Sequence, residues 1–276
     1  MNGTSICNSI ADDLWLLSLD KNSLTDFINK FQNVALQSSN THLKLSKTLS
    51  QPEFIVMENL LTAPESGVTF NPADITRSYL QSGINNHRDL SLCLELMYDT
   101  LSFSFDASPD HAELITLLTR RVSKVLPATA SLQEITHHDN SCPCCQKEKK
   151  KIRNNPSIHP LYWLCSHFVQ NHSELDISFN SKGCAHTINI SPTSMTTHNG
   201  ITHLSDSTPA HLAINLTEVY NVRVQLEVVD GTTSTQLTAY NSFGETTFRI
   251  KQAGSESFQH WNAILQHNHE YTVSQA

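Results

Sequence analysis

The stretch that decides the fold begins at Val219 and reads Val219-Tyr-Asn-Val-Arg-Val-Gln-Leu-Glu-Val-Val. Apolar residues, several of them β-branched, alternate here with polar ones, which is typical of a half-buried strand. The run ends at Asp230-Gly231, and the alternation resumes in Thr235-Gln-Leu-Thr-Ala-Tyr. An Asp-Gly pair between two alternating runs is a strong signal of a hairpin turn. This stretch therefore predicts two antiparallel strands.

The residues around this hairpin extend the pattern. After it, Asn241-Ser-Phe-Gly supplies a turn and Thr246-Thr-Phe-Arg-Ile-Lys a third strand. Before it, Leu175-Asp-Ile-Ser-Phe and Ala185-His-Thr-Ile-Asn-Ile alternate in the same way. Beyond the third strand the period becomes helical, with apolar residues at Phe258, Trp261, Ile264 and Leu265. The C-terminal part is expected to be an antiparallel meander closed by a helix.

The N-terminal half repeats this plan in fainter form. Ser91-Leu-Cys-Leu-Glu-Leu-Met-Tyr and Leu101-Ser-Phe-Ser-Phe read as strands. Ser108-Pro-Asp then begins a helix, and its expected apolar side is made of Leu114, Leu117, Leu118 and Val122. An earlier amphipathic helix is expected from Leu24, Phe27, Ile28 and Phe31. The shared order of strand, strand and helix favours an internal duplication.

The expected fold class is α+β, with two structurally related halves that each form an antiparallel β-sheet with helices packed on one face. Residues 1–126 would form the first half and residues 160–276 the second. Residues 127–159 read as a linker, because they combine prolines, low hydrophobicity and a run of cations from Lys147 to Arg153.

Composition and charge exclude several classes of function. Charged residues make up 16% of the 276 residues, against roughly a quarter in an average soluble protein. There are 18 Lys and Arg residues against 26 Asp and Glu residues, which gives a formal net charge of −8. General nucleic-acid binding needs a basic footprint and is not expected. No Gly-rich phosphate loop or hydrolase motif stands out, so nucleotide and hydrolase chemistry have no support either.

The sequence also bears on the compartment. No window holds the roughly 18 apolar residues that a membrane span requires, so membrane insertion is not expected. Asp12 and Asp13 precede the short apolar run from Leu14, where a signal peptide would carry cations. The seven cysteines are an odd number, and three of them crowd into Cys142, Cys144 and Cys145, unlike a disulfide framework. We expect a reducing, cytoplasmic location.

Six cues in order resemble the C-terminal repeat of the HemS/ChuS family of bacterial cytoplasmic haem-utilisation proteins. They extend over about eighty residues and comprise Gly183-Cys-Ala-His-Thr-Ile, Leu204-Ser-Asp-Ser-Thr-Pro-Ala-His-Leu, Thr217-Glu-Val-Tyr-Asn-Val-Arg, Asp230-Gly231, Gln236-Leu-Thr-Ala-Tyr-Asn-Ser-Phe-Gly and Trp261-Asn-Ala-Ile-Leu. The first repeat is similar through Gly67-Val-Thr-Phe-Asn-Pro and the strand from Ser91. The family's helical lead-in and much of its central segment are missing or shortened here. The resemblance implies a divergent, trimmed HemS/ChuX-like duplication.

The resemblance also implies a haem site. Family members hold haem with a His from the central segment and an Arg from the first repeat, and some degrade it oxidatively. The nearest central candidates here are His137 and His138, as ligands of the haem iron, and the family Arg is matched by Arg77. Family basic and tyrosine residues fall near Arg249 and Lys251, with Lys in place of Tyr. Imidazole is a common haem-iron ligand, and cations can pair the propionates.

Cys142, Cys144 and Cys145 form, with His137 and His138, the densest group of soft metal ligands in the chain. Zinc usually takes two pairs of ligands spaced by two to four residues, and this spacing is tighter. Structural zinc, a haem-responsive Cys-Pro dipeptide and exposed redox-sensitive thiols all stay open as interpretations.

The leading functional prediction is a cytoplasmic haem-binding and haem-trafficking protein of bacterial iron acquisition. Whether haem is also degraded is left open, as are a haem-transport or reductase partner and the oligomeric state. The alternative is a non-enzymatic interaction protein that keeps the duplicated fold and has lost haem.

Overall fold

The computed structural model describes residues 13–19, 21–50, 52–82, 89–96, 99–106, 112–127, 142–181, 183–207 and 210–273. The chain divides into two compact units. Unit 1 is Met1–Ser39, Lys47–Asp139 and Ser181–His186, and unit 2 is Asn40–Ser46, Asn140–Asn180 and Thr187–Ala276. Both units are therefore discontinuous in sequence. The expected boundaries at 126 and 160 follow the sequence repeat, and they stay a prediction.

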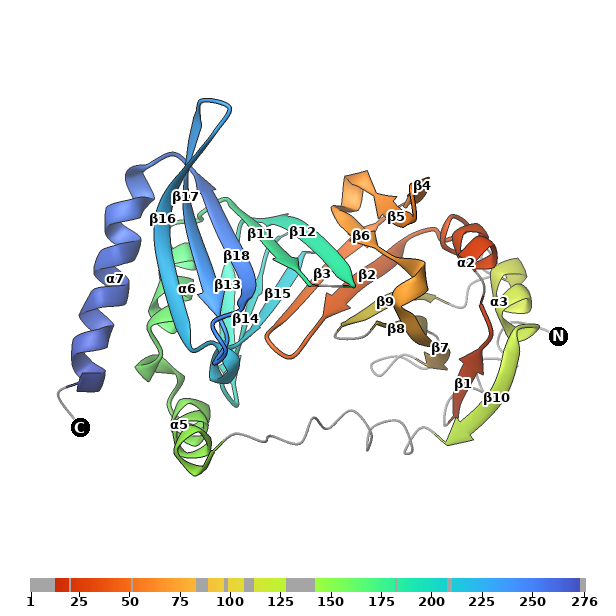
Figure 1. Cartoon of the computed structure of the whole chain (residues 1–276), viewed down its shortest axis with the longest axis horizontal. Coiled ribbons are helices and arrows are strands. Elements are labelled where there is room, and N and C mark those ends of the chain that lie inside the picture. The colour runs from red at the N-terminus through yellow and green to blue at the C-terminus, as the bar shows by residue number, and fades with distance from the viewer. Residues whose placement is uncertain are drawn as a thin grey trace. The chain divides into compact units, whose positions relative to one another are not determined.

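The first half of the chain supplies ten strands and two α-helices to the described residues (Figure 1). In chain order these elements, with two short 3-10 helices, are β1 (Asp13–Leu17), α2 (Lys21–Ile28), β2 (Val34–Ser39), β3 (Leu43–Leu49), β4 (Ile55–Met57), β5 (Leu60–Ala63), η1 (Pro64–Ser66), β6 (Val68–Phe70), η2 (Pro72–Asp74), β7 (Ile75–Ser82), β8 (Asp89–Leu96), β9 (Thr100–Asp106), α3 (Ala112–Thr119) and β10 (Val122–Pro127).

The second half begins with two helices and then forms strands (Figure 1). Its elements are α5 (Pro143–Asn154), η4 (Pro156–Ile158), α6 (Pro160–Gln170), β11 (Leu175–Asn180), β12 (Cys184–Ile190), β13 (Ser194–His198), β14 (Ile201–Ser205), β15 (His211–Asn215), η5 (Leu216–Glu218), β16 (Asn221–Val229), β17 (Thr232–Tyr240), β18 (Thr246–Ala253) and α7 (Glu256–Val273). The α+β class with antiparallel sheets is confirmed.

The two halves share one order of elements and one order of strands. A helix, five strands, a 3-10 turn, three strands and a helix follow one another from α2 to α3 and again from α6 to α7, apart from the added η1. The strand orders β7-β8-β9-β2-β3 and β16-β17-β18-β11-β12 correspond element by element. At the next position β3 pairs with β15, and β12 pairs with β6. The first half thus places β6, β5 and β4 beside β12 of the second half, and the second half places β15, β14 and β13 beside β3 of the first half. This exchange explains why both units are discontinuous in sequence.

The hairpin that decides the fold forms as expected. Asp230 and Gly231 both have positive φ, 50° and 78°, which is the type I′ turn that matches strand twist. It pairs Val229 with Thr232 and continues to Asn221 opposite Tyr240. Helix α7 runs alongside β16 and β17 (Figure 1). Its Trp261 is fully buried and packs on Phe168 of α6, with ring centroids 5.2 Å apart.

Two sequence expectations about helices differ from the structure. Val122 does not extend the apolar side of α3, because the helix ends at Thr119 and Val122 begins β10, which pairs with β1. Part of the expected linker is helical: α5 has Cys142 as N-cap residue and Pro143 in its first turn. Proline in the first turn is a standard helix-start signal, and the Cys142 sulfur accepts from the Cys145 N–H in the place of the usual N-cap oxygen. Lys149 and Ile152 of α5 are buried in unit 2. Among the described helices, none combines the length and apolar composition needed to cross a bilayer.

Candidate functional site

The predicted haem residues fall into three places. His137 and His138 lie outside the described residues. Arg77 lies on β7 in unit 1, whereas Arg249 and Lys251 lie on β18 in unit 2. The described candidates are therefore divided between unit 1, with Arg77, and unit 2, with Arg249 and Lys251.

Arg77 is half-buried beside a small polar cavity of unit 1. Its Nε lies 3.5 Å from Oε2 of Glu95, its partner in the β7–β8 register. The cavity measures about 260 Å³, and its lining includes Arg77, Thr76, Ser18 and Pro72. That volume is below the roughly 300–1,000 Å³ of pockets that enclose drug-sized ligands. Arg77 can therefore present a guanidinium to an anionic group, but a porphyrin does not fit inside this cavity.

Arg249 and Lys251 share one face of the meander, because residues two apart on a strand point the same way. Arg249 pairs with Thr238 of β17 and Ser178 of β11, and Lys251 pairs with Gln236 and Asp176. The opposite face is apolar: the register joins Ile250 to Leu237 and to Ile177, and all three are fully buried. Arg249 and Lys251 therefore lie on the polar face of this sheet.

The polar face gathers a third cation, which the sequence analysis missed. Arg223 of β16 pairs with Thr238, so Arg223, Thr238 and Arg249 form a row across three neighbouring strands. Counting back from the Asp230-Gly231 turn gives this pairing and could have found it. Lys251 forms an ion pair with Glu227. No described carboxylate forms an ion pair with either arginine. We call Arg223, Arg249 and Lys251 the cation face.

A histidine of unit 1 is buried and hydrogen-bonded through one of its ring nitrogens. His186 on β12 is 0% exposed, and its Nδ1 is hydrogen-bonded to the Ser38 hydroxyl. Burial, aided by the charge of Lys47, lowers the pKa of His186 from 6.5 to about 3. The imidazole is therefore neutral at neutral pH and acts in packing and hydrogen bonding.

Two half-buried histidines of unit 2 face each other. His203 on β14 and His211 on β15 place Nδ1 and Nε2 3.2 Å apart. Burial is the main reason that the pKa values of both histidines are lowered. The next cause is the charge of His203 for the pKa of His211, and the charge of Lys44 for the pKa of His203. Neutral imidazoles are the form that binds iron. The positive charge of Lys44 also acts on both histidines. The strand pairing of the described residues does not place the two histidines beside the cation face.

A cavity of about 210 Å³ lies within unit 2, where α5, η4 and the start of β16 meet. Its lining includes Cys145, Ile152, His159 and Tyr220. It is smaller than pockets for drug-sized ligands, so it also excludes a porphyrin.

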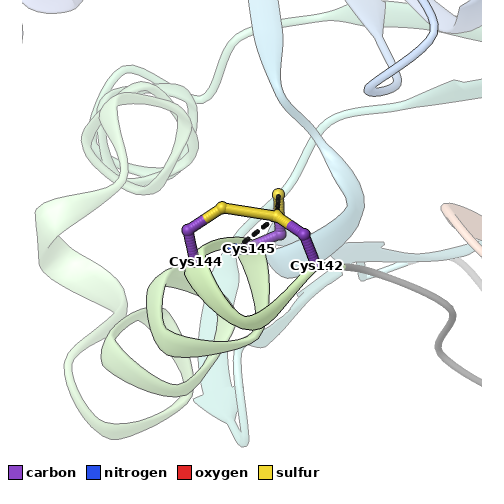
Figure 2. Close-up of side chains that lie close together, drawn as sticks. All are labelled: Cys142, Cys144 and Cys145. Carbon is purple, nitrogen blue, oxygen red and sulfur yellow. Dashed lines mark hydrogen bonds between the residues drawn. A yellow bond between two sulfur atoms is a disulfide. The ribbon is translucent and has the colours of Figure 1, made fainter.

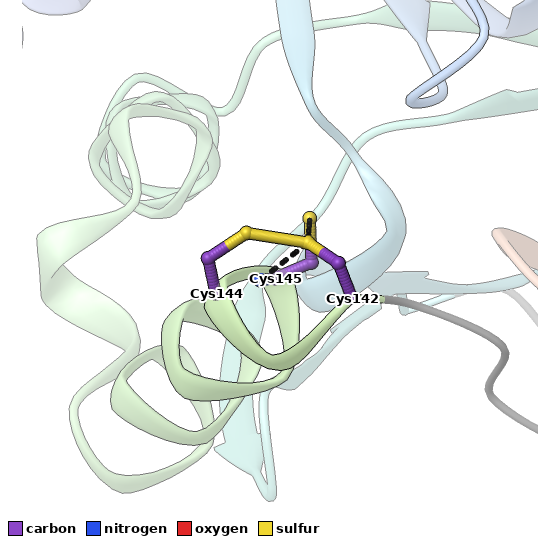
Figure 3. Close-up of a disulfide and its surroundings, with 3 residues drawn as sticks. All are labelled: Cys142, Cys144 and Cys145. Carbon is purple, nitrogen blue, oxygen red and sulfur yellow. Dashed lines mark hydrogen bonds between the residues drawn. A yellow bond between two sulfur atoms is a disulfide. The ribbon is translucent and has the colours of Figure 1, made fainter.

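The three clustered cysteines lie at the first turn of α5 (Figure 2), and Cys145 among them lines that cavity. Their three sulfur atoms lie within 4.8 Å of one another. Cys142 and Cys144 form a disulfide, and the Sγ atoms of Cys142 and Cys145 are 3.3 Å apart (Figure 3). Among the described residues, these cysteines are the one group of three or more His, Cys, Asp or Glu side chains that could hold a metal ion.

No family model matches the sequence, and no curated protein does. Solved structures do match. The haem-degrading enzyme ChuS of Escherichia coli O157:H7 is 12% identical, with a TM-score of 0.64 over 91% of this chain and 86% of ChuS. Holo-PhuS, a haem-binding protein of Pseudomonas aeruginosa, is 13% identical, with a TM-score of 0.63 over 95% of this chain and 89% of PhuS.

At this identity the likeness establishes the fold. The chain has the fold of ChuS and PhuS over nearly its whole length. The resemblance to the HemS/ChuS family expected from the sequence is therefore confirmed at the level of fold. The match covers both halves, including the N-terminal half where the motifs were faint.

Proposed function

We propose that this chain binds haem in the cytoplasm and takes part in bacterial haem-iron utilisation. The observation that carries this proposal is the fold, which is shared over more than nine-tenths of the chain with a haem-degrading enzyme and a haem-binding protein. Fold alone does not imply function, so the proposal also needs residues with suitable chemistry.

The cation face provides such residues. Haem carries two anionic propionates, and arginine guanidinium groups bind carboxylates through paired hydrogen bonds. Arg223 and Arg249 flank Thr238 from the strands on either side of it, so their backbones are two strand spacings, about 10 Å, apart. On long side chains the two guanidinium groups can still reach one ligand on this polar face, where Thr238 between them is itself buried. Lys251, held by Glu227, would contribute less.

The iron ligand is proposed to be His137 or His138, and Arg77 is proposed to face the haem as well. Bound haem supplies an iron centre that a neutral imidazole can ligate. Arg77 keeps part of its side chain exposed, 40%, despite its pairing with Glu95. The exposed part of Arg77 can therefore meet an anionic or polar ligand while the guanidinium stays beside Glu95, whose side chain is 17% exposed.

A haemin titration tests this proposal. The purified full chain is titrated with haemin and followed by the Soret band, beside a His137→Ala/His138→Ala double variant. We expect saturable one-to-one binding that weakens, or changes its ligation spectrum, in the double variant. The matched control is His198→Ala/His260→Ala, two exposed histidines of unit 2, which should bind as the parent does.

Two other outcomes of this titration, and one added experiment, are informative. Unchanged binding in the double variant would keep haem binding and refute His137 and His138 as ligands. Absence of a specific Soret shift at micromolar protein would refute haem binding and favour the alternative, an interaction protein that retains the fold. Adding ascorbate to a haem complex tests oxidative degradation, which should bleach the Soret band if the protein degrades haem.

A further inference from the structure

The cysteine cluster at the start of α5 has the geometry of a metal site. Thiolates bound to one zinc ion at about 2.3 Å lie about 3.8 Å apart in a tetrahedral arrangement. The sulfur atoms of Cys142, Cys144 and Cys145 already lie within 4.8 Å of one another, and one pair is 3.3 Å apart. Figure 2 shows the three sulfur atoms gathered beside the first turn of α5, two of them joined in the disulfide.

The other described cysteines are not available for this role. Cys93, Cys165 and Cys184 are buried. Burial raises the pKa of Cys93 and of Cys165 to about 12, and it also raises that of Cys184. Metals bind the thiolate form, so these three thiols stay protonated and inert. Cys142 and Cys144 are exposed and Cys145 is partly exposed, which leaves the cluster as the accessible set.

The surroundings of the cluster suit bound thiolates. The backbone N–H of Cys145 donates to the Cys142 sulfur over 3.5 Å, and the helix N-terminus favours negative charge there. Tyr220 lies beside Cys145, and its hydroxyl is hydrogen-bonded to the Cys145 side chain. Hydrogen bonds to ligating sulfurs orient and stabilise metal–thiolate centres. Lys147, Lys150 and Lys151 lie on the same helix and are exposed, and Lys151 is ion-paired with Glu148.

The disulfide between Cys142 and Cys144 is a poor structural staple. It bridges residues only two apart in sequence, so it restricts the unfolded chain very little. This disulfide therefore contributes little to the stability of the folded chain.

We propose that Cys142, Cys144 and Cys145 form a three-thiolate site for a thiophilic d10 metal ion, Zn²⁺ or Cu⁺, once a dithiol reductant has supplied the two electrons and two protons that open the Cys142–Cys144 disulfide, itself becoming a disulfide. Thiolates select these ions over harder cations. Zn²⁺ would keep its fourth position for water, and Cu⁺ would be three-coordinate. The proposal extends beyond haem binding and does not depend on it.

The test uses the full chain, reduced with a phosphine, stripped with a chelator and free of haem. Zn²⁺ is titrated in competition with a chromogenic indicator, and Cu⁺ anaerobically in competition with a Cu⁺-selective dye. The two titrations distinguish the ions. We expect one equivalent of one or both ions, and a loss of affinity of at least about 100-fold in Cys142→Ser/Cys144→Ser/Cys145→Ser. Co²⁺ should give a thiolate charge-transfer band that the triple variant lacks.

The matched control is Cys165→Ala, which removes a buried thiol of α6 and should still bind one equivalent. Unchanged affinity in the triple variant would overturn the proposal, because the ion would then be held elsewhere. So would the absence of stoichiometric binding of either ion to the reduced parent chain. A haemin titration of the same triple variant reports separately on haem binding, so that failure of the two proposals can be told apart.

Discussion

Lys149 Nζ lies 2.8 Å from Oε1 and 3.0 Å from Oε2 of Glu218, joining α5 to η5 within unit 2. The lysine side chain is 8% exposed and the glutamate side chain 25%. Its neighbours Lys147, Lys150 and Lys151 are all exposed. Within the cation run, Lys149 therefore holds α5 in place. Helix α5 carries the cysteine cluster and lines the small cavity.

Replacing Lys149 should destabilise unit 2 markedly. Lys149→Ala leaves Glu218 as an uncompensated, mostly buried charge, and breaking a buried pair in this way costs about 3–5 kcal/mol. Because Glu218 keeps a quarter of its side chain exposed, we expect the free energy of unfolding to fall by about 2–3 kcal/mol. Urea unfolding followed by circular dichroism measures this change.

The control for this variant is Lys150→Ala on the same helix. Lys150 is exposed, and surface substitutions usually change stability by less than about 0.5 kcal/mol. Equal losses in the two variants would mean that the ion pair does not anchor α5. A Lys149→Ala/Glu218→Ala double variant that recovers part of the loss would show that the unpaired carboxylate is its cause.

Local signals predicted much of the fold. The hairpin at Asp230-Gly231 needs positive φ at two adjacent positions, and that requirement is written in the residues themselves. Trp261 was expected in the core from helical spacing alone and is fully buried. The pairing of β3 with β15 could not be predicted in this way, because it joins Leu43 to Ile214 with no shared turn.

The α5 segment was interpreted as a linker because its composition is that of a solvated loop. Its order comes from tertiary contacts, the burial of Ile152 and the pairing of Lys149 with Glu218, which no local pattern encodes. The residues named for haem binding stay a prediction. Arg249 and Lys251 do share a polar face, Arg223 was missed, and the proposed ligands His137 and His138 lie outside the described residues.

The buried imidazole of His186 should make stability depend on pH. Its pKa, lowered by burial to about 3, lies below the unfolded value of about 6.5, so the unfolded chain binds more protons between these values. Stability is thus fully present above about pH 6.5 and is lost as the pH falls. From about pH 7.5 to about pH 5 the loss from this residue should be about 2 kcal/mol.

Urea unfolding of the parent and of His186→Gln at the two pH values measures this dependence. The variant has no titrating ring there, so its stability should fall less on acidification, even though it starts lower. His198→Gln, an exposed control, should keep the parent's dependence. A His186→Gln protein with the parent's full pH dependence would contradict the assignment.

Two glycines with the same backbone conformation should respond differently to alanine. Gly231 has φ +78° with nothing within 4 Å of an added Cβ, whereas at Gly200, φ +79°, that atom would lie 2.7 Å from Thr217 Cγ2. Left-handed backbone costs a non-glycine residue about 1–2 kcal/mol, and overpacking adds about 1–3 kcal/mol. Gly231→Ala should therefore cost about 1 kcal/mol and Gly200→Ala about 3 kcal/mol in urea unfolding. Equal losses would show that Thr217 moves aside freely.

The cation face makes a graded prediction for haemin affinity, which rests on the proposed function. Arg249 forms no ion pair with any described carboxylate, whereas Lys251 is paired with Glu227. A charge-assisted hydrogen bond is worth about 1.5–3 kcal/mol, and 1.4 kcal/mol is about tenfold in affinity. Arg249→Ala should weaken haemin binding by about tenfold or more, and Lys251→Ala by less, because that ammonium must first leave its carboxylate. Arg121→Ala, an exposed arginine of unit 1, should bind as the parent does. Soret titrations in which Arg249→Ala and Arg121→Ala behave alike would remove this face from the haem site.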